Sequence, residues 1–282
     1  MATRKILTDR HFTWDDYLAR VKARPEKTAW GESSMTLGDS SWYGTKDLPA
    51  AVRLAETGWA EGTQQILEGL EHESSGSVPS LFPAREYDVA GEFPDVAAYC
   101  AGVPEHMVSL GEQTTGTSPV IRLGINGGAS ASTDPDRIMR YGIAVLSHAV
   151  AFQRAGYSVA IDWLKVAAQS GPSSMQLHLT RLEILAPGSN LDVDRLAFVL
   201  AHPSMLRRFW FADVEMESRM RGIRSQYGFS RPIAEAGPAW YDGVALPGVM
   251  ECPSHAADST SAMAEWLGQA IETARTSHAE AA

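Results

Sequence analysis

The chain has 282 residues, of which 44% are hydrophobic and 21% are charged, so it is long enough to bury a full core. Its formal net charge of −10 argues against broad electrostatic attraction to nucleic acid or to anionic lipid. Cys100 and Cys252 lie far apart and in no metal-binding spacing, which favours unpaired thiols in a reducing compartment. The first residues hold no apolar signal segment, and no apolar run approaches the ~18 residues of a membrane span. We therefore expect a soluble, cytoplasmic protein.

Residues 1–83 predict a helical N-terminal region. The apolar spacing from Trp14 to Ala23 predicts an amphipathic helix with Thr13 as its cap. A second helix is expected from about Asp47 to His72, and the glycines at positions 58 and 62 indicate a close helix contact or a break into two helices.

The segment Ser74–Pro83 is the most linker-like part of the chain. We place a boundary there, which divides the chain into the helical region 1–83 and an α/β domain over 84–282. Directly after the boundary, alternation around Tyr87 and Val89 allows an edge strand, and a short helix is expected at Pro94–Ala101.

The stretch Pro119–Trp163 predicts a βαβ unit. An apolar run, Val120–Ile125, is typical of a buried parallel strand and leads into a loop of glycine and serine residues. A long apolar helix follows, capped by Thr133 or Asp134, and a β-branched run at Tyr157–Trp163 forms the next strand. This unit predicts a three-layer α/β fold with a mostly parallel central sheet.

Three further elements and a terminal helix complete the predicted domain. Alternation predicts a strand at Met175–Ala186, and a helix capped by Asn190 or Asp192 runs on to His202. The last strand is expected at Gly243–Met250, and the closing helix at Ser261–Thr276.

The loop Gly124–Ser132 lies where open α/β sheets place their ligands. It does not match the dinucleotide fingerprint, and it lacks the lysine of a Walker motif, although helix N–H groups can hold an anion without one. A tight turn that binds no ligand is the plainer interpretation. Strand, serine loop, long helix and second strand together resemble the opening of a von Willebrand factor A domain. The resemblance implies that fold over roughly residues 118–276 and a metal-binding loop of the pattern Asp-x-Ser-x-Ser.

The candidate ligand or metal loop comprises Asn126, Ser130, Ser132, Asp162 and Asp192. The serine pattern begins with Asn126 or Gly128 rather than with an aspartate, and hard cations such as Mg²⁺ prefer anionic oxygen ligands. The two carboxylates follow neighbouring predicted strands and are the acids best placed to face the loop, although helix capping explains Asp192 equally well. Of two histidines in predicted elements, we expect His148 to be packed in a helix and His178 to face solvent.

An arginine-rich segment follows the third strand and is interleaved with aromatic residues. Such a run can bind phosphates and stack on bases, but it can also be a solvated face paired with the neighbouring acids. The candidate anion or nucleic-acid patch comprises Arg207, Arg208, Arg219, Arg221 and Arg224.

Two N-terminal motifs carry a second resemblance. Trp42-Tyr43-Gly44-Thr45 and Gly58-Trp59-Ala60-Glu61-Gly62 resemble an uncharacterised family of phages and actinobacterial mobile elements. No complete catalytic set can be assembled from the spacing of the residues. The favoured hypothesis is a non-enzymatic assembly protein that binds itself or another protein in the host cytoplasm. The alternatives are a metal- or nucleotide-dependent enzyme acting on nucleic acid and a nucleic-acid-binding protein.

Overall fold

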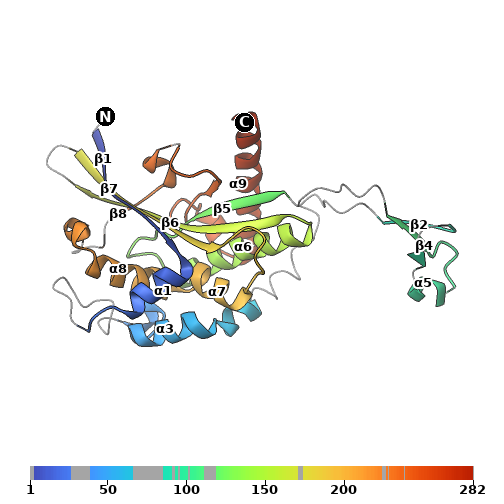
Figure 1. Cartoon of the computed structure of the whole chain (residues 1–282), viewed down its shortest axis with the longest axis horizontal. Coiled ribbons are helices and arrows are strands. Elements are labelled where there is room, and N and C mark those ends of the chain that lie inside the picture. Colours follow the sequence, from blue (N-terminus) through green and yellow to red (C-terminus); the bar gives the residue numbers. More distant parts are fainter. Residues whose placement is uncertain are drawn as a thin grey trace.

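The computed structural model describes residues 3–26, 39–65, 85–90, 93–94, 96–100, 102–110, 119–170, 174–223, 227, 229–237 and 239–281. Its main sheet has the strand order β1-β7-β6-β5-β9, and β8 pairs with β6 beside that path (Figure 1). The strands are β1 (Thr3–Thr13), β5 (Val120–Asn126), β6 (Ser158–Ser170), β7 (Ser174–Leu185), β8 (Phe229–Arg231) and β9 (Val244–Leu246).

The pairing of the strands confirms a mostly parallel central sheet. β1 runs parallel to β7, and β5 runs parallel to both β6 and β9. β7 and β8 are antiparallel to β6. The sequence predicted the strand at β7 but not its direction. Because Asp192 follows β7, the direction of this strand determines at which end of the sheet Asp192 lies.

The predicted βαβ unit is present as β5, α6 (Pro135–Arg154) and β6. Asp134 caps α6 by accepting a hydrogen bond from the Asp136 N–H, and Pro135 occupies the first turn, where it needs no hydrogen-bond partner. Most of the helix is buried, which is why its sequence leaves only a narrow polar stripe.

Helices cover one face of the sheet, and a short irregular segment covers the other. The helical layer contains α6, α7 (Val193–Ala201), a π-helix η1 (Met205–Trp210), α8 (Phe211–Met216) and α9 (Thr260–Ala281). On the opposite face, η3 (Ile233–Ala236) and the residues Trp240 and Tyr241 pack against side chains of β6 and β7. The sheet is therefore the middle of three layers, as predicted.

The N-terminal region contributes a strand as well as helices. The predicted helices are present as α1 (Trp14–Lys22) and α3 (Leu48–Thr57), with α2 (Ser40–Tyr43) between them, and Thr13 and Asp47 are the caps. Gly58, with φ of 84°, ends α3, and the chain is helical again at 60–65. The difference from the prediction is β1, which extends the main sheet, so the described residues 3–26 and 39–57 share the core of the α/β domain.

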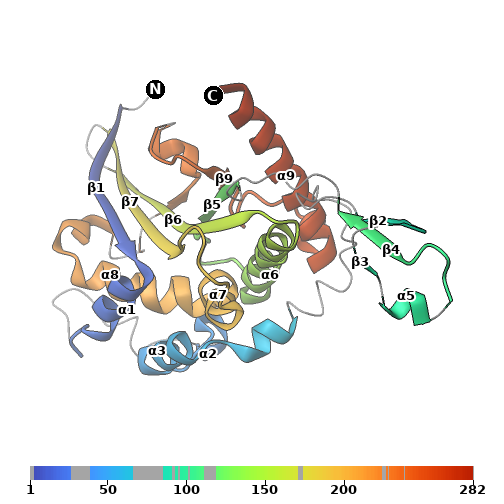
Figure 2. The same ribbon diagram turned by 45° about the vertical axis from the view of Figure 1, so that its right-hand side comes forward.

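The described residues between 85 and 110 form a second, small sheet with a short helix, here called the small module. It has the antiparallel order β2-β4-β3 and contains β2 (Arg85–Asp88), β3 (Phe93–Pro94), α5 (Val96–Cys100) and β4 (Met107–Leu110). Figures 1 and 2 both draw it apart from the main sheet. The predicted linker Ser74–Pro83 lies outside the described residues. The division of the chain at residues 83 and 84 thus did not anticipate that a second sheet follows it.

Candidate functional site

The glycine loop between β5 and α6 is the structural centre of the candidate site. β5 ends at Asn126, whose buried side chain accepts a hydrogen bond from the Gly128 N–H at 3.0 Å and donates to the carbonyl of Arg231 at 3.1 Å. The Gly127 N–H donates to the Leu164 carbonyl of β6 at 2.8 Å. The polar groups at the start of the loop therefore hold the loop to the sheet.

Close packing explains the two glycines of the loop. A Cβ atom at Gly127 would overlap the indole of Trp163, and one at Gly128 would lie 2.9 Å from the side chain of Ser230. Both approaches are too close for a larger residue. The pair of glycines is thus required by neighbouring side chains from β6 and β8.

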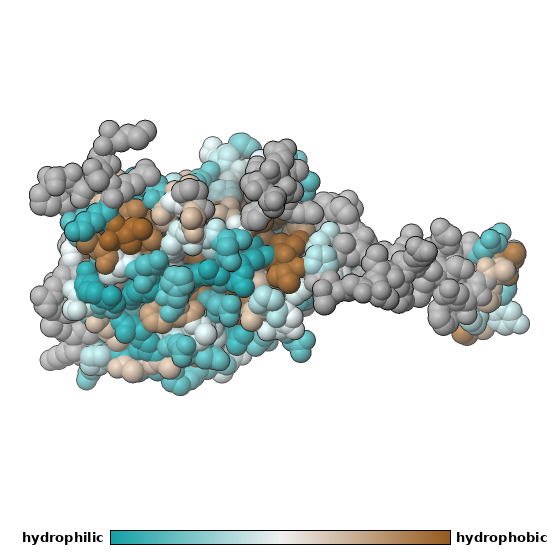
Figure 3. All heavy atoms as spheres, turned by 45° about the horizontal axis from the view of Figure 1, so that its top comes forward, coloured by the Kyte–Doolittle hydropathy of each residue, from teal (hydrophilic) through white to brown (hydrophobic). Residues whose placement is uncertain are grey.

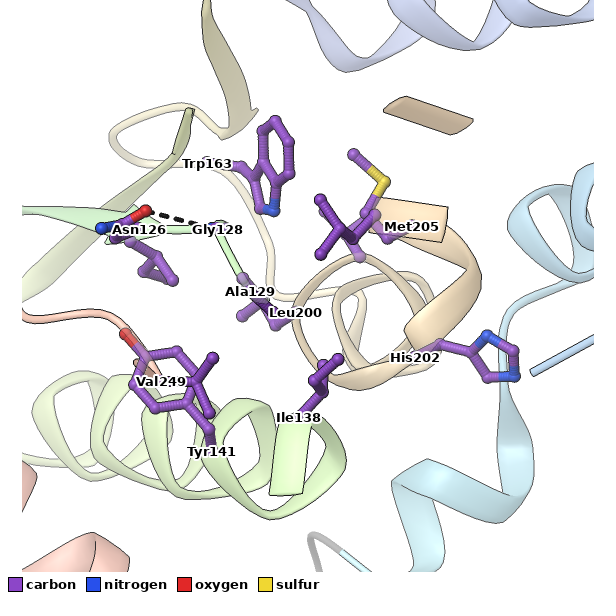
Figure 4. A pocket seen from close by; sticks show the side chains of 14 residues that line it. Asn126, Gly128, Ala129, Ile138, Tyr141, Trp163, Leu200, His202, Met205 and Val249 are labelled. Carbon is purple, nitrogen blue, oxygen red and sulfur yellow. Dashed lines mark hydrogen bonds between the residues drawn. The ribbon is translucent and has the colours of Figure 1, made fainter. Parts of the chain in front are cut away.

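A small cavity lies between the loop, α6 and α7. Ile138 and Tyr141 line it from α6, Leu200 lines it from α7, and Trp163 closes it from β6 (Figure 4). Its volume of about 20 Å³ has room for one or two water molecules. The walls are mainly apolar, so this cavity does not accommodate a nucleotide or a phosphate group.

The serine part of the loop does not fit a magnesium ion. Ser130 and Ser132 have their hydroxyl oxygens 3.0 Å apart in a hydrogen bond with each other, and the Ser130 N–H donates to Thr133 Oγ1. Within the described part of the chain, no three His, Cys, Asp or Glu side chains group as ligands for a metal ion. Because Mg²⁺ is held by carboxylate oxygens, this set of residues lacks the donors that it needs.

Asp162 does not face the loop. Its fully buried carboxylate accepts hydrogen bonds from Arg122 Nη1 at 2.9 Å, Arg181 Nη2 at 3.2 Å and the Tyr241 hydroxyl at 2.9 Å. These partners lie on the sheet face opposite to Trp163 and the glycine loop. Burial and the negative charge of Asp162 both raise the pKa of Tyr241, so this phenol stays protonated as a donor. The placement of Asp162 in the loop site was wrong, because alternation along β6 turns it away.

Asp192 is a helix cap near the end of the sheet opposite to the glycine loop. Its carboxylate accepts a hydrogen bond from the Arg195 N–H at 3.1 Å. Because β7 is antiparallel to β6, its carboxyl end at Leu185 lies beside Ile161, near the amino end of β6. Asp192 follows β7 and so lies near the amino ends of β5 and β6, whereas the glycine loop follows the carboxyl end of β5. The capping interpretation was correct, and the proximity to the loop was wrong.

Arg207 and Arg208 are buried structural residues rather than parts of a nucleic-acid surface. The guanidinium of Arg207 donates to the carbonyls of Trp42 and Thr133, and it lies 4.1 Å from the centre of the Trp42 ring. The Arg208 guanidinium donates to the carbonyl of Thr45 and lies 3.8 Å from the centre of the Tyr43 ring. The two arginines attach the Trp-Tyr-Gly-Thr segment to the helical layer. The sequence placed them on a surface because buried arginines look like exposed ones in a sequence.

Of the other three arginines of the predicted patch, Arg219 has a side chain that the structure describes. Arg219 is exposed and donates to Glu217 from Nε at 2.9 Å, and its hydrogen bonds help to lower the pKa of Glu217 to about 2. Arg221 lies in the 3₁₀-helix η2 (Ser218–Ile223), and Arg224 lies outside the described residues. Arg219 thus agrees with the interpretation of a solvated face paired with neighbouring acids.

Lys165 and Ser230 are brought together beside the glycine loop, and neither was predicted from the sequence as a site residue. Lys165 lies in β6 and is 2% exposed, and its Nζ donates to Ser230 Oγ from β8. Ser230 Oγ in turn donates to the carbonyl of Ala129 in the loop at 3.3 Å. Burial lowers the pKa of Lys165 to about 7. The signal in the sequence was a single lysine inside the apolar run of β6.

A further row of polar groups is buried on the same face of the sheet. His178 is fully buried, and its Nδ1 lies 3.0 Å from Thr8 Oγ1, so the prediction that it faces solvent was wrong. Burial lowers the pKa of His178 to about 4. His148 is packed as predicted, with Nδ1 2.8 Å from the Ala144 carbonyl.

The small module exposes apolar side chains. Among the described residues, eight large hydrophobic side chains are exposed, and four of them lie in this module of 26 positions: Val89, Val96, Tyr99 and Val103. In the space-filling view, the part of the module that is coloured shows brown hydrophobic side chains at its surface (Figure 3). Singly exposed apolar residues are ordinary, but four of them in one small module are more than the rest of the described surface carries for its size.

The fold and the site define the class of this protein. It is a three-layer α/β protein whose glycine loop is fixed by packing and whose two polar clusters are buried in opposite faces of one sheet. The chain belongs to the family described as domain of unknown function DUF7192, whose model matches residues 7–270. No curated protein and no solved structure matches the chain. In the part of the chain that the structure describes, no helix is long and apolar enough to cross a membrane.

Proposed function

We propose that the protein has a non-enzymatic assembly function, in which it binds a second copy or another protein through its small module. The observation that carries this proposal is the exposure of Val96 and Tyr99, at 66% and 64%, on the short helix α5 of a module whose sheet has three short strands. So small a sheet cannot bury an apolar face by itself. The cost of leaving these side chains in water is removed when a partner covers them.

The α/β domain serves in this proposal as the support of the module. Strand, serine loop, helix and strand follow one another as β5, the loop, α6 and β6, which agrees with a von Willebrand A-like fold that has lost its metal-binding carboxylate. The Trp-Tyr-Gly-Thr segment that supports a phage or mobile-element origin is attached to the core by Arg207 and Arg208. We further propose that the protein acts in the host cytoplasm.

The alternative functions receive less support from the geometry. A metal- or nucleotide-dependent enzyme would need Asp162, Asp192 and the loop serines to converge, and they lie in three different places. A nucleic-acid binder would need Arg207 and Arg208 at the surface, and both are buried.

The test compares the mass of the wild-type protein in solution with that of a double variant, Val96→Lys with Tyr99→Lys. We expect light scattering over a concentration series to give a discrete oligomer, or a discrete complex with a co-purified protein, for the wild type. The double variant should release it. Met250→Lys is the matched control, because Met250 is also an exposed apolar residue, at 48%, but lies outside the module. A wild-type protein that is a monomer at every concentration and brings no stoichiometric partner with it contradicts the proposal.

A further inference from the structure

β6 changes its neighbour in the sheet at Lys165. β5 pairs with β6 as far as Asn126, opposite Leu164, and the chain then leaves the sheet in the glycine loop. β8 takes the vacated side of β6 from Val166 onward. Lys165 lies between the two pairings, and it points to the face where the loop passes. Ligands of α/β proteins bind at such points, beyond the carboxyl end of a strand where neighbouring chains diverge.

The contacts of Lys165 join it to a hydroxyl group and to the loop. Its Nζ donates to Ser230 Oγ, which lies against Gly128 and donates to the Ala129 carbonyl. Ser230 is only partly buried, and its hydroxyl lies between the Lys165 amine and the Ala129 carbonyl in this chain of hydrogen bonds. The backbone of the glycine loop, with no side chain between, adjoins the hydroxyl.

The surroundings of Lys165 leave its amine without an acidic partner. Among the described residues, no carboxylate forms an ion pair with it. Lys165 is paired with Thr180 of β7, which is paired in turn with Arg10 of β1. The charge of Arg10 is neutralised by Asp213 of α8, so this carboxylate does not pair with Lys165. From η1, the ring centre of Trp210 lies 5.9 Å from Nζ. Burial shifts this amine toward its neutral form, which has a lone pair that can accept a proton.

We propose that Ser230 is a nucleophile activated by Lys165, and that the pair forms an acyl-transfer site for small esters beside the glycine loop. Pairs of a serine and a neutral lysine are one of the recurring ways to activate a hydroxyl group. This site goes beyond the assembly function and does not depend on it, because the small module contributes no residue to it.

Ser230, Lys165 and water together account for every proton and bond in the hydrolysis of an ester. The Ser230 hydroxyl turns from Ala129 to Lys165 and gives its proton to the neutral amine as Oγ bonds to the carbonyl carbon of the ester. The bond between that carbon and the alkoxy oxygen then breaks, and the Lys165 ammonium returns the proton to the leaving alcohol. An acyl group remains on Ser230. Water attacks it with Lys165 again accepting the proton, which releases the acid and restores the serine.

A fluorophosphonate probe tests the pair without knowledge of the natural substrate. Ser230 Oγ should bond to phosphorus as fluoride leaves, and the proton should pass to Lys165. We expect one adduct per chain on Ser230, identified by peptide mass spectrometry, at a rate that rises with pH through about 7 as the pKa of Lys165 predicts. Ser230→Ala should take no adduct, and Lys165→Met should react more slowly by a factor on the order of 100 or more.

Ser261→Ala is the control, because Ser261 is an exposed serine at the start of α9 and should not alter the labelling. Thermal unfolding of each variant separates loss of activation from loss of fold. A folded wild-type protein that takes no adduct on Ser230 at pH 9 overturns the proposal. A folded Lys165→Met variant that reacts as fast as the wild type, with the same pH profile, overturns it too.

Discussion

Arg10 and Asp213 form a two-point ion pair inside the protein. Arg10 Nη1 donates to Asp213 Oδ1 at 2.9 Å, and Nη2 donates to Oδ2 at 2.6 Å. Arg20 Nε adds a third hydrogen bond to the same carboxylate at 2.7 Å. The contact joins β1 to α8 across 203 positions of sequence, and the carboxylate is fully buried. It therefore fixes the first strand of the chain to the helical layer.

Asp213→Asn should destabilise the protein strongly. The change removes the charge of the carboxylate to which both arginines donate and leaves them the more distant Glu217 carboxylate, at 3.9 and 3.8 Å. Breaking a buried pair in this way costs about 3–5 kcal/mol. Glu56→Gln is the matched control, since its partner Lys22 is 49% exposed and such surface pairs contribute about 0–1 kcal/mol. Unfolding in urea measures both free energies. Equal, small losses in the two variants would mean that the buried pair adds no more than a surface pair does.

The same ion pair explains why sequence reasoning missed β1. The strands and the helix of the βαβ unit were predictable, because Val120–Ile125 and Ile138–Phe152 are apolar and Asp134-Pro135 is a strong helix start. In β1, by contrast, Thr8 and Arg10 face the protein interior. Their partners lie far away in the sequence, so the buried positions read as polar and no strand pattern emerges.

The residues of the candidate site were predicted wrongly from the sequence for a related reason. A parallel strand at β7 would have brought Asp192 toward the glycine loop, but nothing local in Met175–Ala186 encodes the direction of pairing. Lys165 and Ser230 are 65 positions apart, and only the pairing of β6 with β8 makes them neighbours. The local sequence pattern thus predicted the helices and strands, whereas the contacts between polar side chains could be seen only in the folded structure.

Gly142→Ala should lower stability although alanine favours helices. A Cβ atom at Gly142 in α6 would overlap the backbone of Leu200 and Ala201, where α7 crosses closely. We expect a net loss of about 1–3 kcal/mol from this overpacking. At Gly268 in α9, the atom near the added Cβ is His148 Nε2 at 3.1 Å, the end of a side chain that has to shift by only a few tenths of an ångström. Gly268→Ala should therefore be neutral, or should gain up to about 1 kcal/mol from helix propensity, in the same urea assay.

Arg207→Met should affect stability rather than nucleic-acid binding. It removes hydrogen bonds to the Trp42 and Thr133 carbonyls and leaves those acceptors unpaired, for an expected loss of about 2–3 kcal/mol. Arg53→Met, on the exposed side of α3, should change stability by less than about 0.5 kcal/mol. Fluorescence anisotropy with labelled DNA at low salt provides the second measurement. A stable Arg207→Met protein that lost DNA affinity, while Arg53→Met kept it, would reinstate the arginine patch.

Lys165 should make the stability of the fold depend on pH in the neutral to alkaline range. Burial lowers its pKa from 10.5 to about 7 in the folded protein, whereas the unfolded chain keeps the ordinary value. Between these two values the unfolded state binds more protons than the folded state. Stability should therefore rise with pH through this window, by up to about 1.4 kcal/mol per pH unit, and the folded state should be penalised below pH 7.

Lys165→Met isolates this contribution, because methionine fills a similar volume and does not titrate. We expect the variant to be more stable than the wild type at pH 7, where the lysine is costly, and the two curves to approach each other toward pH 10. Urea unfolding from pH 6 to 10 measures the difference, in which the tyrosines and cysteines common to both proteins cancel. A constant difference across the range would place the pKa of the folded-state lysine near its ordinary value. In that case the amine at the glycine loop would be a cation at neutral pH, and it could not accept the proton of Ser230.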